Sequence, residues 1–409
     1  MLTETATTQD LTFTRTISAP ASEVFRAFTA PSALRGWLCN AAQVAPHRGG
    51  RVYLWWNDGY YATGEFSDYR PYEAFAFTWN GRGDPSPTEV RVTLHEEGGG
   101  TTLQLIHSGI GSGPEWFDTA RAVGEGWESH LENLQAFVET GIDPRFARRP
   151  MFGLSDAEEL NPDLAKKLGT SINEGLRLLG LVDGMGAQNA GLTRGDIVTG
   201  LGGKPVNTFA SLGVALQDYK AGDKVPVNIY RDGQEQTVTV ELSKRNMPEV
   251  PATSKELAAS MRQTFTQLDA ELDEVLAGVT EEEASYRPSP DDWNAKEIIA
   301  HLVASEQDAH AWVAALEEDA DREDIFHSNT PVRIKSLAAA YSTLPAIVDA
   351  LKKSDAVTLA MAETLPEKIV ARKDDYYLLA QWWSTFADHN REHFAEIKKL
   401  VEAARASGQ

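Results

Sequence analysis

The sequence predicts a multidomain protein: an α+β domain, then a mostly-β domain, then an all-α four-helix bundle. Three observations support this prediction. At 409 residues the chain is too long for a single hydrophobic core. Two proline-containing stretches, residues 141–150 and 246–252, divide it into three parts. The first two parts contain short strand-like segments, whereas apolar residues recur at helical spacing in the last. We therefore place the domains at residues 1–145, 146–246 and 253–409.

The first part shows the element order strand, helix, several strands and a long final helix. Residues 11–17 alternate between apolar and polar side chains, which is typical of a half-buried strand. The run from Ala19 to Ser22 opens a helix, with Ser22 expected as its N-cap. We expect further strands at residues 51–56, 73–79, 89–94 and 101–106 and a long helix at residues 116–139.

Several short motifs of this part match a known family. They are Ile17-Ser18-Ala19-Pro20 with Val24-Phe25, Phe28 with Pro31 and Trp37, and Gly126-Trp127. On these residues the first domain resembles the helix-grip fold of the SRPBCC superfamily, in the branch named for activators of the heat-shock chaperone ATPase. That resemblance implies a helix across a curved sheet, with an apolar cavity for a small apolar molecule. The aromatic residues expected at the cavity are Trp37, Trp55, Tyr61, Trp79 and Trp127. The alternative is that these aromatic side chains fill the core and no ligand binds.

The second part contains a run from Asn189 to Val198 and, later, an Asp232-Gly233 hairpin turn signal. On these residues it resembles a PDZ domain of the HtrA-like type. In PDZ domains a peptide C-terminus adds a strand beside a helix, and the amides of a short loop hold its carboxylate. The resemblance implies a protein or peptide C-terminus bound at Phe152, Gly153, Leu154, Leu212 and Leu216. The alternative is a PDZ fold that only spaces its neighbours.

The last part opens with Thr253-x-x-Glu256, the signature of a capping box. Apolar residues at helical spacing follow it, and we expect further helices at about 294–317, 335–363 and 376–404. Four helices joined by short links are typical of a bundle. Between residues 251 and 409 there are 16 Lys and Arg against 29 Asp and Glu, so this part holds −13 of the chain's net charge of −22.

Three of the chain's nine histidines form a candidate metal site in this bundle. His389 and His393 stand one helical turn apart inside an apolar stripe, so both rings should point into the bundle. His301, between Ile298 and Leu302, should also point inward. Three imidazoles can bind a divalent first-row metal and leave coordination positions open, which is a catalytic arrangement. The alternative is three histidines that bond only to other side chains or to solvent.

The context of these histidines matches a second known family. The matching residues are Trp293-Asn294-Ala295-Lys296-Glu297, His301-Leu302 with Glu306, and Asp388-His389 with His393. Here the chain resembles the DinB/YfiT-like superfamily, which implies His301, His389 and His393 as ligands of a divalent metal. Zinc, nickel and iron all suit three imidazoles. Glu297 is a candidate to orient the ring of His301. Characterised members include transferases and isomerases that use thiols such as bacillithiol or mycothiol, which implies a low-molecular-weight thiol as cofactor.

Composition restricts the partners and the compartment. A net charge of −22 and a pI of about 4.8 argue against nucleic acid or an anionic membrane surface as the main partner. The single cysteine, Cys39, permits no intrachain disulfide and fits a reducing compartment. The first ten residues lack the features of a signal peptide, and no apolar run approaches the roughly 18 residues that a membrane span needs. We therefore expect a cytoplasmic protein.

Two functions of different classes fit these features. The first is a metal-dependent thiol S-transferase or isomerase that acts at the three histidines. The second is a non-enzymatic adaptor or stress-related binding protein. Its second domain would bind a protein tail, and its first domain an apolar ligand or client protein. An enzyme would join a thiol to an electrophile only with the metal and all three histidines present, whereas an adaptor would bind a peptide and turn nothing over.

Overall fold

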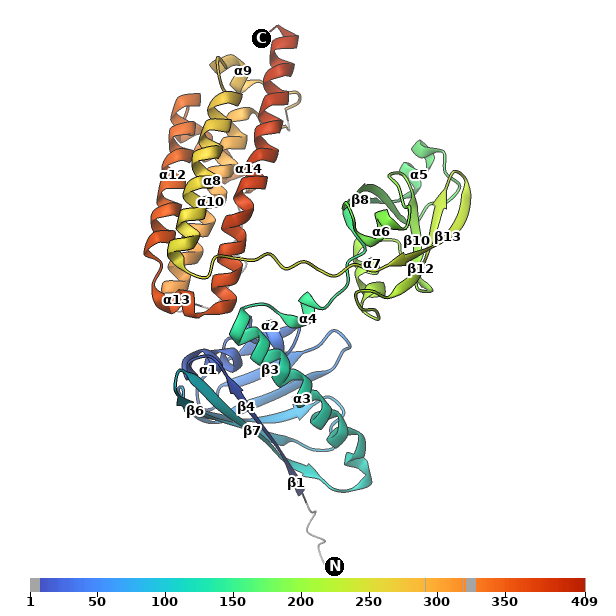
Figure 1. Ribbon diagram of the computed structural model, residues 1–409, viewed down its shortest axis with the longest axis vertical. Coiled ribbons are helices and arrows are strands. Elements are labelled where there is room, and N and C mark those ends of the chain that lie inside the picture. Colours follow the sequence, from blue (N-terminus) through green and yellow to red (C-terminus); the bar gives the residue numbers. More distant parts are fainter. Residues whose placement is uncertain (1–7, 291, 319, 321–328, 409) are drawn as a thin grey trace, which may run out of the picture. The chain divides into compact units, whose positions relative to one another are not determined.

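The computed structural model describes residues 8–290, 292–318, 320 and 329–408. Residues 1–7, part of the stretch considered above for a signal peptide, lie outside this range. The chain separates into two compact units, Met1–Ile142 with Glu249–Gln409, and Asp143–Pro248. The first unit contains an antiparallel sheet domain and a helical bundle, and the second contains a smaller sheet (Figure 1).

The first domain is a seven-stranded antiparallel sheet crossed by a long helix, in the strand order β1-β7-β6-β5-β4-β3-β2 (Figure 1). Its strands are β1 Thr8–Ile17, β2 Ala41–Val44, β3 Arg51–Trp55, β4 Tyr61–Arg70, β5 Ala74–Gly81, β6 Thr88–Glu97 and β7 Gly100–Gly111. Its helices are α1 Ala21–Thr29, α2 Pro31–Trp37 and α3 Phe117–Thr140, with the short η1 Pro114–Trp116 before α3. The core lies between the sheet and the helices, and α3 contributes Trp127, Leu131 and Leu134 to it.

The expected order of elements in this domain is confirmed, with one error at a helix start. The N-cap of α1 is Pro20 and not Ser22, and among the described residues no side chain caps this helix end. Pro20 already has the extended backbone of an N-cap residue (φ −59°, ψ 153°), so the helix starts one residue before Ser22. The pattern also gave no prediction for α2, β2 or β4.

The second domain is a small sheet in the order β13-β12-β10-β9-β8, with β11 paired to β10. The strands are β8 Leu154–Glu159, β9 Leu176–Leu181, β10 Ile197–Leu201, β11 Lys204–Pro205, β12 Lys224–Arg231 and β13 Gln234–Glu241. The helices are α4 Pro144–Ala147, α5 Pro162–Leu168, α6 Gly186–Asn189 and α7 Phe209–Leu216. Asp232 and Gly233 both have positive φ (51° and 82°) and join β12 to β13, which confirms the predicted hairpin turn.

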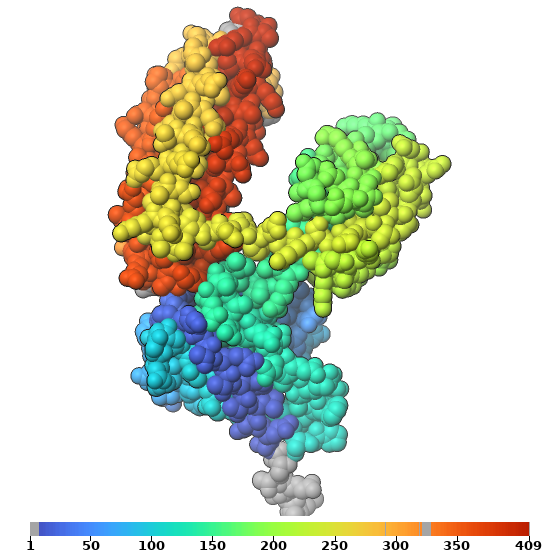
Figure 2. All heavy atoms as spheres, in the orientation of Figure 1, coloured from blue at the N-terminus to red at the C-terminus, as the bar shows by residue number. Residues whose placement is uncertain are grey.

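The third domain is a bundle of four long helices (Figure 1). These are α8 Ser254–Val275, α10 Ala295–Glu317, α12 Leu344–Thr364 and α14 Lys373–Ser407, and α9 Glu281–Ser285, α11 Pro331–Ala340 and α13 Glu367–Ala371 are shorter. The capping box at Thr253 and Glu256 is confirmed. Figure 2 shows the long helices as a continuous surface of packed side chains.

The prediction of a single helix over residues 335–363 is wrong. The chain forms two helices there, α11 and α12, with a break between Ala340 and Leu344. Thr343 caps the second helix by accepting a hydrogen bond from the backbone N–H of Ala346 (3.4 Å), and Pro345 occupies its first turn. Proline lacks an N–H and is favourable only at the start of a helix, so a new helix begins here.

Candidate functional site

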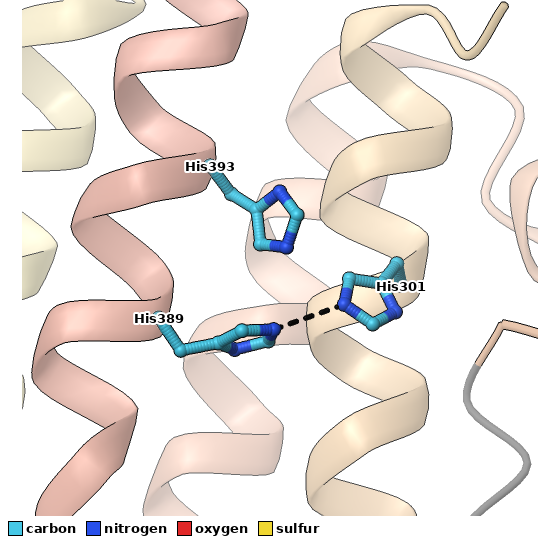
Figure 3. A group of neighbouring side chains, drawn as sticks. All are labelled: His301, His389 and His393. Atoms are coloured by element: carbon cyan, nitrogen blue, oxygen red, sulfur yellow. Dashed lines mark hydrogen bonds between the residues drawn. The ribbon is translucent and has the colours of Figure 1, made fainter. Parts of the chain in front are cut away.

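The three predicted histidines come together in the bundle. His301 lies on α10, and His389 and His393 lie one turn apart on α14 (Figure 3). One ligating nitrogen of each ring lies within 4.8 Å of the other two. The ring centroids are 4.7–5.1 Å apart, and the ring planes are inclined at 74–89° to one another. The rings therefore meet edge to face around one point between the two helices.

Local structure places His301 at a defined height in the bundle. The side chain of Asn294 accepts a hydrogen bond from the backbone N–H of Glu297 (2.9 Å), and the carboxylate of Glu297 accepts one from the backbone N–H of Asn294 (3.2 Å). This capping box starts α10 and puts His301 two turns inside it. Glu297 also accepts a hydrogen bond from Arg287 (2.6 Å). Both of its oxygens thus bond at the helix start, away from the role of orienting His301 that the resemblance implied.

Electrostatics favour neutral imidazoles at this point. Burial, and then the nearby His393, lower the pKa of His389 below its usual value. His393 bonds through Nδ1 to a carboxylate oxygen of Glu396 (2.9 Å), which leaves Nε2 as the ring nitrogen available to a cation. His301 is only 4% exposed. The lowered pKa favours the uncharged imidazole of His389, whose lone pair can bind a cation.

The donor set fits a divalent metal. The Nε2 atoms of His301 and His389 lie 3.1 Å apart (dashed line in Figure 3). A tetrahedral ion with metal–nitrogen bonds of about 2.0–2.1 Å holds its nitrogens about 3.3 Å apart. Three imidazoles suit zinc, nickel or iron and leave at least one position for another ligand.

A cavity of about 390 Å³ adjoins the three histidines. Its other lining residues are Trp293, Ser305, Asp308, Asn329, Trp382, Thr385 and Phe386. Arg333 forms an ion pair with Asp308 and donates a hydrogen bond to the carbonyl oxygen of Ala304 (2.9 Å), which holds the Asp308 carboxylate in place. Sequence reasoning missed Ser305 and Asp308. Their spacing of four and seven residues from His301 puts them on the same helix face and could have identified them.

Comparison with known proteins assigns each of the three parts. Residues 18–139 match the family model described as "Activator of Hsp90 ATPase homolog 1-like protein", residues 166–242 match "PDZ domain", and residues 264–397 match "DinB superfamily". The chain carries an AHSA1-like, a PDZ and a DinB-like domain, in that order. No single model covers half of the chain.

Individual relatives match only parts of the chain. The periplasmic serine endoprotease DegP of Escherichia coli K12 is 31% identical over 96 residues, 24% of this chain and 20% of DegP. The serine protease Do-like HtrA of Bacillus subtilis 168 is 33% identical over 129 residues, 30% of this chain and 29% of HtrA. This chain thus spans about a fifth of the length of DegP.

Two solved structures resemble about a third of the chain. One is the protein MLL2253 of Mesorhizobium loti, at 25% identity over 32% of this chain and 96% of that one, with a TM-score of 0.30. The other is CalU16 of Micromonospora echinospora, at 28% identity over 32% of this chain and 74% of that one, with a TM-score of 0.28.

In the AHSA1-like domain a second cavity, of about 560 Å³, lies between the sheet and α3. Two of the five expected aromatic residues, Trp79 and Trp127, line it. The other three lie elsewhere: Trp37 is fully buried and donates a hydrogen bond to the carbonyl oxygen of Ala27, Trp55 is half-buried, and Tyr61 is exposed and stacks on Tyr53.

Trp56 and Tyr60 also line this cavity, although they were not among the five aromatic residues selected from the sequence. Side chains alternate across a strand, so Trp56 shares a face with the buried Leu54, whereas Trp55 points to the opposite face. The alternation around Leu54 could therefore have separated the two neighbouring tryptophans.

In the PDZ domain the predicted loop and helix flank β8. Phe152 and Leu212 are buried in the domain core, and Leu154 and Leu216 pack against it. Gly153 has a φ of +99°. The carbonyl oxygens of Phe152 and Gly153 accept hydrogen bonds from the backbone N–H groups of Ala187 (3.0 Å) and Val182 (2.9 Å). These bonds fix the path of the loop.

A further polar group lies inside the DinB-like bundle. Glu306 and Asp355 are both buried, at 2% and 6% exposure. Glu306 accepts a hydrogen bond from the hydroxyl of Thr358 (2.8 Å), whose oxygen also lies 2.7 Å from Nε2 of His310. Burial, and then Asp355, raise the pKa of Glu306 well above its usual value. Burial also raises the pKa of Asp355 to about 6, although its hydrogen bond with Glu306 acts in the opposite direction.

Within the part of the chain that the structure describes, no helix is long and apolar enough to cross a bilayer.

Proposed function

We propose that the DinB-like bundle binds a divalent metal ion through His301, His389 and His393 and catalyses thiol S-transfer at that ion. The observation that carries this proposal is the convergence of three imidazole nitrogens, from two helices, to within 4.8 Å of one another. Zinc, nickel and iron suit this donor set. A low-molecular-weight thiol of the bacillithiol or mycothiol type would be the second ligand.

The adjoining residues have separate roles in this proposal. When bound, the ion would act as a Lewis acid that lowers the pKa of a coordinated thiol. Glu396 holds the ring of His393 through Nδ1, so that Nε2 faces the centre. Trp382 and Phe386 form an apolar wall that limits water around the electrophile. Asp308, held by Arg333, offers a carboxylate oxygen as proton acceptor within the cavity.

The reaction would be a substitution at an electrophilic carbon. A carbon–sulfur bond forms, the leaving group departs with the electron pair of its own bond, and the thiol proton passes to Asp308 or to solvent. The assay is the reaction of bacillithiol or mycothiol with monochlorobimane, in which sulfur displaces chloride. We expect turnover by the metal-loaded parent and none by a His301→Ala/His389→Ala/His393→Ala variant.

Metal content tests the site independently of any substrate. Elemental analysis of protein purified without a histidine tag should find close to one ion per chain in the parent and none in the triple variant. The absence of metal from the parent, even after dialysis against zinc and nickel salts, would overturn the metal site and the enzymatic proposal. Metal without turnover would retain the site and overturn the S-transferase activity.

A second candidate function is peptide binding by the PDZ domain, as in an adaptor protein. Among the described strands of this sheet, β8 is an end strand whose one sheet partner is β9. The N-terminus of α7 lies near the end of β8, because the backbone N–H of Phe209 donates to the carboxylate of Glu159 (3.3 Å). An end strand beside a helix can accept a peptide as an added strand. In such an adaptor the AHSA1-like domain would hold a ligand or a client protein.

The adaptor role predicts binding without turnover. Fluorescent peptides with a free C-terminal carboxylate and an apolar last residue should bind the full chain, and the same peptides with an amidated C-terminus should not. Equal binding of both forms would overturn carboxylate recognition at the Met151–Leu154 loop.

We also propose a cytoplasmic location. The chain contains one cysteine, Cys39, which is buried, and such sparse use of cysteine suits a reducing compartment. DegP, in contrast, is a periplasmic serine endoprotease. Fractionation of cells that express the full chain tests the proposal, and recovery in the periplasmic fraction would overturn it.

A further inference from the structure

The cavity of the AHSA1-like domain has an aromatic wall. Trp56, Tyr60, Trp79 and Trp127 line it between the sheet and α3. Neighbouring ring centroids are 5.3 Å apart for Trp56 and Tyr60, 6.2 Å for Trp56 and Trp79, and 5.9 Å for Trp79 and Trp127. The ring planes are inclined at 52–61° to one another. These rings therefore present π faces and edges in several directions around one space.

The charged residues at this cavity are mainly acidic. Asp58, Asp84 and Asp118 line it, against one arginine, Arg82. Asp118 is at its exposed edge and lies 3.8 Å from Arg121. Asp84 lies deeper and is half-buried, and burial raises its pKa. The negative electrostatic potential at the inner wall of the cavity therefore comes chiefly from Asp84. Asp58 contributes nearer the surface.

The imidazole of His107 adds no positive charge at neutral pH. Its Nδ1 accepts a hydrogen bond from the indole N–H of Trp127 (3.0 Å), and its Nε2 lies 2.6 Å from the hydroxyl of Thr88. Burial lowers the pKa of His107 to about 4. The indole N–H of Trp127 can only donate a hydrogen bond. The Nδ1 atom that accepts it must therefore carry a lone pair. His107 is thus a neutral part of the wall.

Gly81 allows the polar and aromatic groups to meet. A Cβ atom at this position would lie 2.1 Å from the hydroxyl oxygen of Tyr60 and 2.2 Å from Oδ2 of Asp84. The same Asp84 oxygen accepts a hydrogen bond from the backbone N–H of Gly81 (3.1 Å), and Tyr60 accepts one from the indole N–H of Trp79 (3.1 Å). A carboxylate and a phenol are therefore held beside the aromatic wall at a position where any side chain would clash.

We propose that this cavity binds an organic cation, an ammonium compound with alkyl or aryl substituents, in preference to a neutral apolar molecule. A cation would be attracted to the faces of the tryptophan and tyrosine rings and, at the same time, to the nearby carboxylates. A neutral ligand of the same shape would displace water from Asp84 without replacing its charge, and a buried unpaired carboxylate is costly. An anion would face three carboxylates, whereas Arg82 is the one arginine or lysine among the lining residues. This inference does not depend on the metal site.

Three probes of similar shape separate the outcomes. They are benzyltrimethylammonium, its uncharged carbon analogue neopentylbenzene, and the anion benzylsulfonate. Binding to the full chain can be followed by tryptophan fluorescence, because Trp56, Trp79 and Trp127 line the cavity. We expect the ammonium to bind at least about ten-fold more tightly than the neutral analogue. Equal or tighter binding of the neutral analogue, preference for the sulfonate, or no binding of any of the three would overturn the proposal.

A pair of variants tests the role of the carboxylate. Asp84→Asn keeps an oxygen that can accept from Gly81 but removes the charge, so the affinity for the ammonium should fall about five-fold or more while that for neopentylbenzene does not fall. Asp68 lies on β4 and outside the cavity lining, so Asp68→Asn should change neither the affinity for the ammonium nor that for neopentylbenzene. A loss of ammonium binding that is equal in both variants, or equal for both probes, would contradict the assignment of Asp84.

Discussion

The Nε2 atoms of His301 and His389 lie 3.1 Å apart, although 88 residues separate the two histidines in the chain. At this distance one of the two nitrogens can donate a hydrogen bond to the other, or both can bind the same cation. His393 completes the group from the next turn of α14. The bundle therefore presents a preformed set of nitrogen donors.

Single substitutions should distinguish this group from other histidines. We expect His301→Asn or His389→Asn to weaken Co²⁺ binding at least about 100-fold, because a three-ligand site cannot hold the ion with two. The visible d–d absorption of bound Co²⁺ reports both affinity and coordination. His310→Asn is the matched control on α10, because His310 bonds to Thr358 instead. Equal loss of Co²⁺ in the control would mean that bundle packing, and not ligation, is being measured.

The carboxylate of Glu396 should tune the site without contacting the ion. Glu396→Gln removes the charged acceptor from Nδ1 of His393, so we expect metal affinity at pH 7 to fall about ten-fold. Competition with a chromophoric chelator measures the change. Glu402→Gln, an exposed substitution on the same helix, should leave the affinity unaltered. An unchanged affinity for Glu396→Gln would show that the carboxylate does not orient the ring.

His107 should make the AHSA1-like domain less stable in acid. Burial lowers its pKa from 6.5 to about 4 in the folded domain, so the unfolded state binds the proton more tightly. The stabilising contribution is fully present above pH 6.5 and is lost as pH falls toward 4, by about 3 kcal/mol. Amide hydrogen exchange in β6 and β7, measured across this range, reports the loss. The His107→Gln variant should not show this loss of stability between pH 6.5 and 4. The control His95→Gln, at an exposed position, should still show it.

The buried carboxyl pair of the bundle should have the opposite pH dependence. Burial raises the pKa of Asp355 from 3.8 to about 6, so its contribution to stability is present below 3.8 and is lost as pH rises through 6. Asp355→Asn removes the charge and should raise the free energy of unfolding at pH 7.5 by about 1–3 kcal/mol. Hydrogen exchange of the backbone amides in α12 measures this change in the free energy of unfolding. Asp349→Asn, at an exposed position, is the control. Destabilisation by Asp355→Asn at every pH would show that the contacts of the carboxylate outweigh its charge.

Gly153 should be essential to the loop of the PDZ domain. A Cβ atom there would lie 2.6 Å from Cβ of Met185, and the φ of +99° is strained for any other residue. We expect Gly153→Ala to cost about 2 kcal/mol or more and to weaken peptide binding. Gly203→Ala is a matched control. Its φ is also positive (83°), but no atom of the described residues lies within 4 Å of its Cβ position. If both variants lose stability equally, backbone strain alone accounts for the effect.

Local patterns in the sequence were sufficient for the domain order and for two of the three histidines of the candidate metal site. His389 and His393 share a helix face because of their spacing, and the Asp232-Gly233 turn needs only its own two residues. The break before α12 was also encoded locally, in Thr343 and Pro345, but the longer apolar period concealed it. These features depend on interactions between neighbours in the chain, which residue type and spacing specify.

The tertiary structure decided which side chains from distant segments of the chain come into contact. The closeness of His301 to His389 depends on how α10 packs against α14, and no local pattern specifies that register. Similarly, the sheet and α3 together decide that Trp56 and Tyr60 line the cavity while Trp37 fills the core. Side-chain convergence is a property of packing between elements, whereas secondary structure is largely a property of short-range spacing. The sequence therefore determined which residues could form these sites, and the packing of helices and strands decided which of them meet.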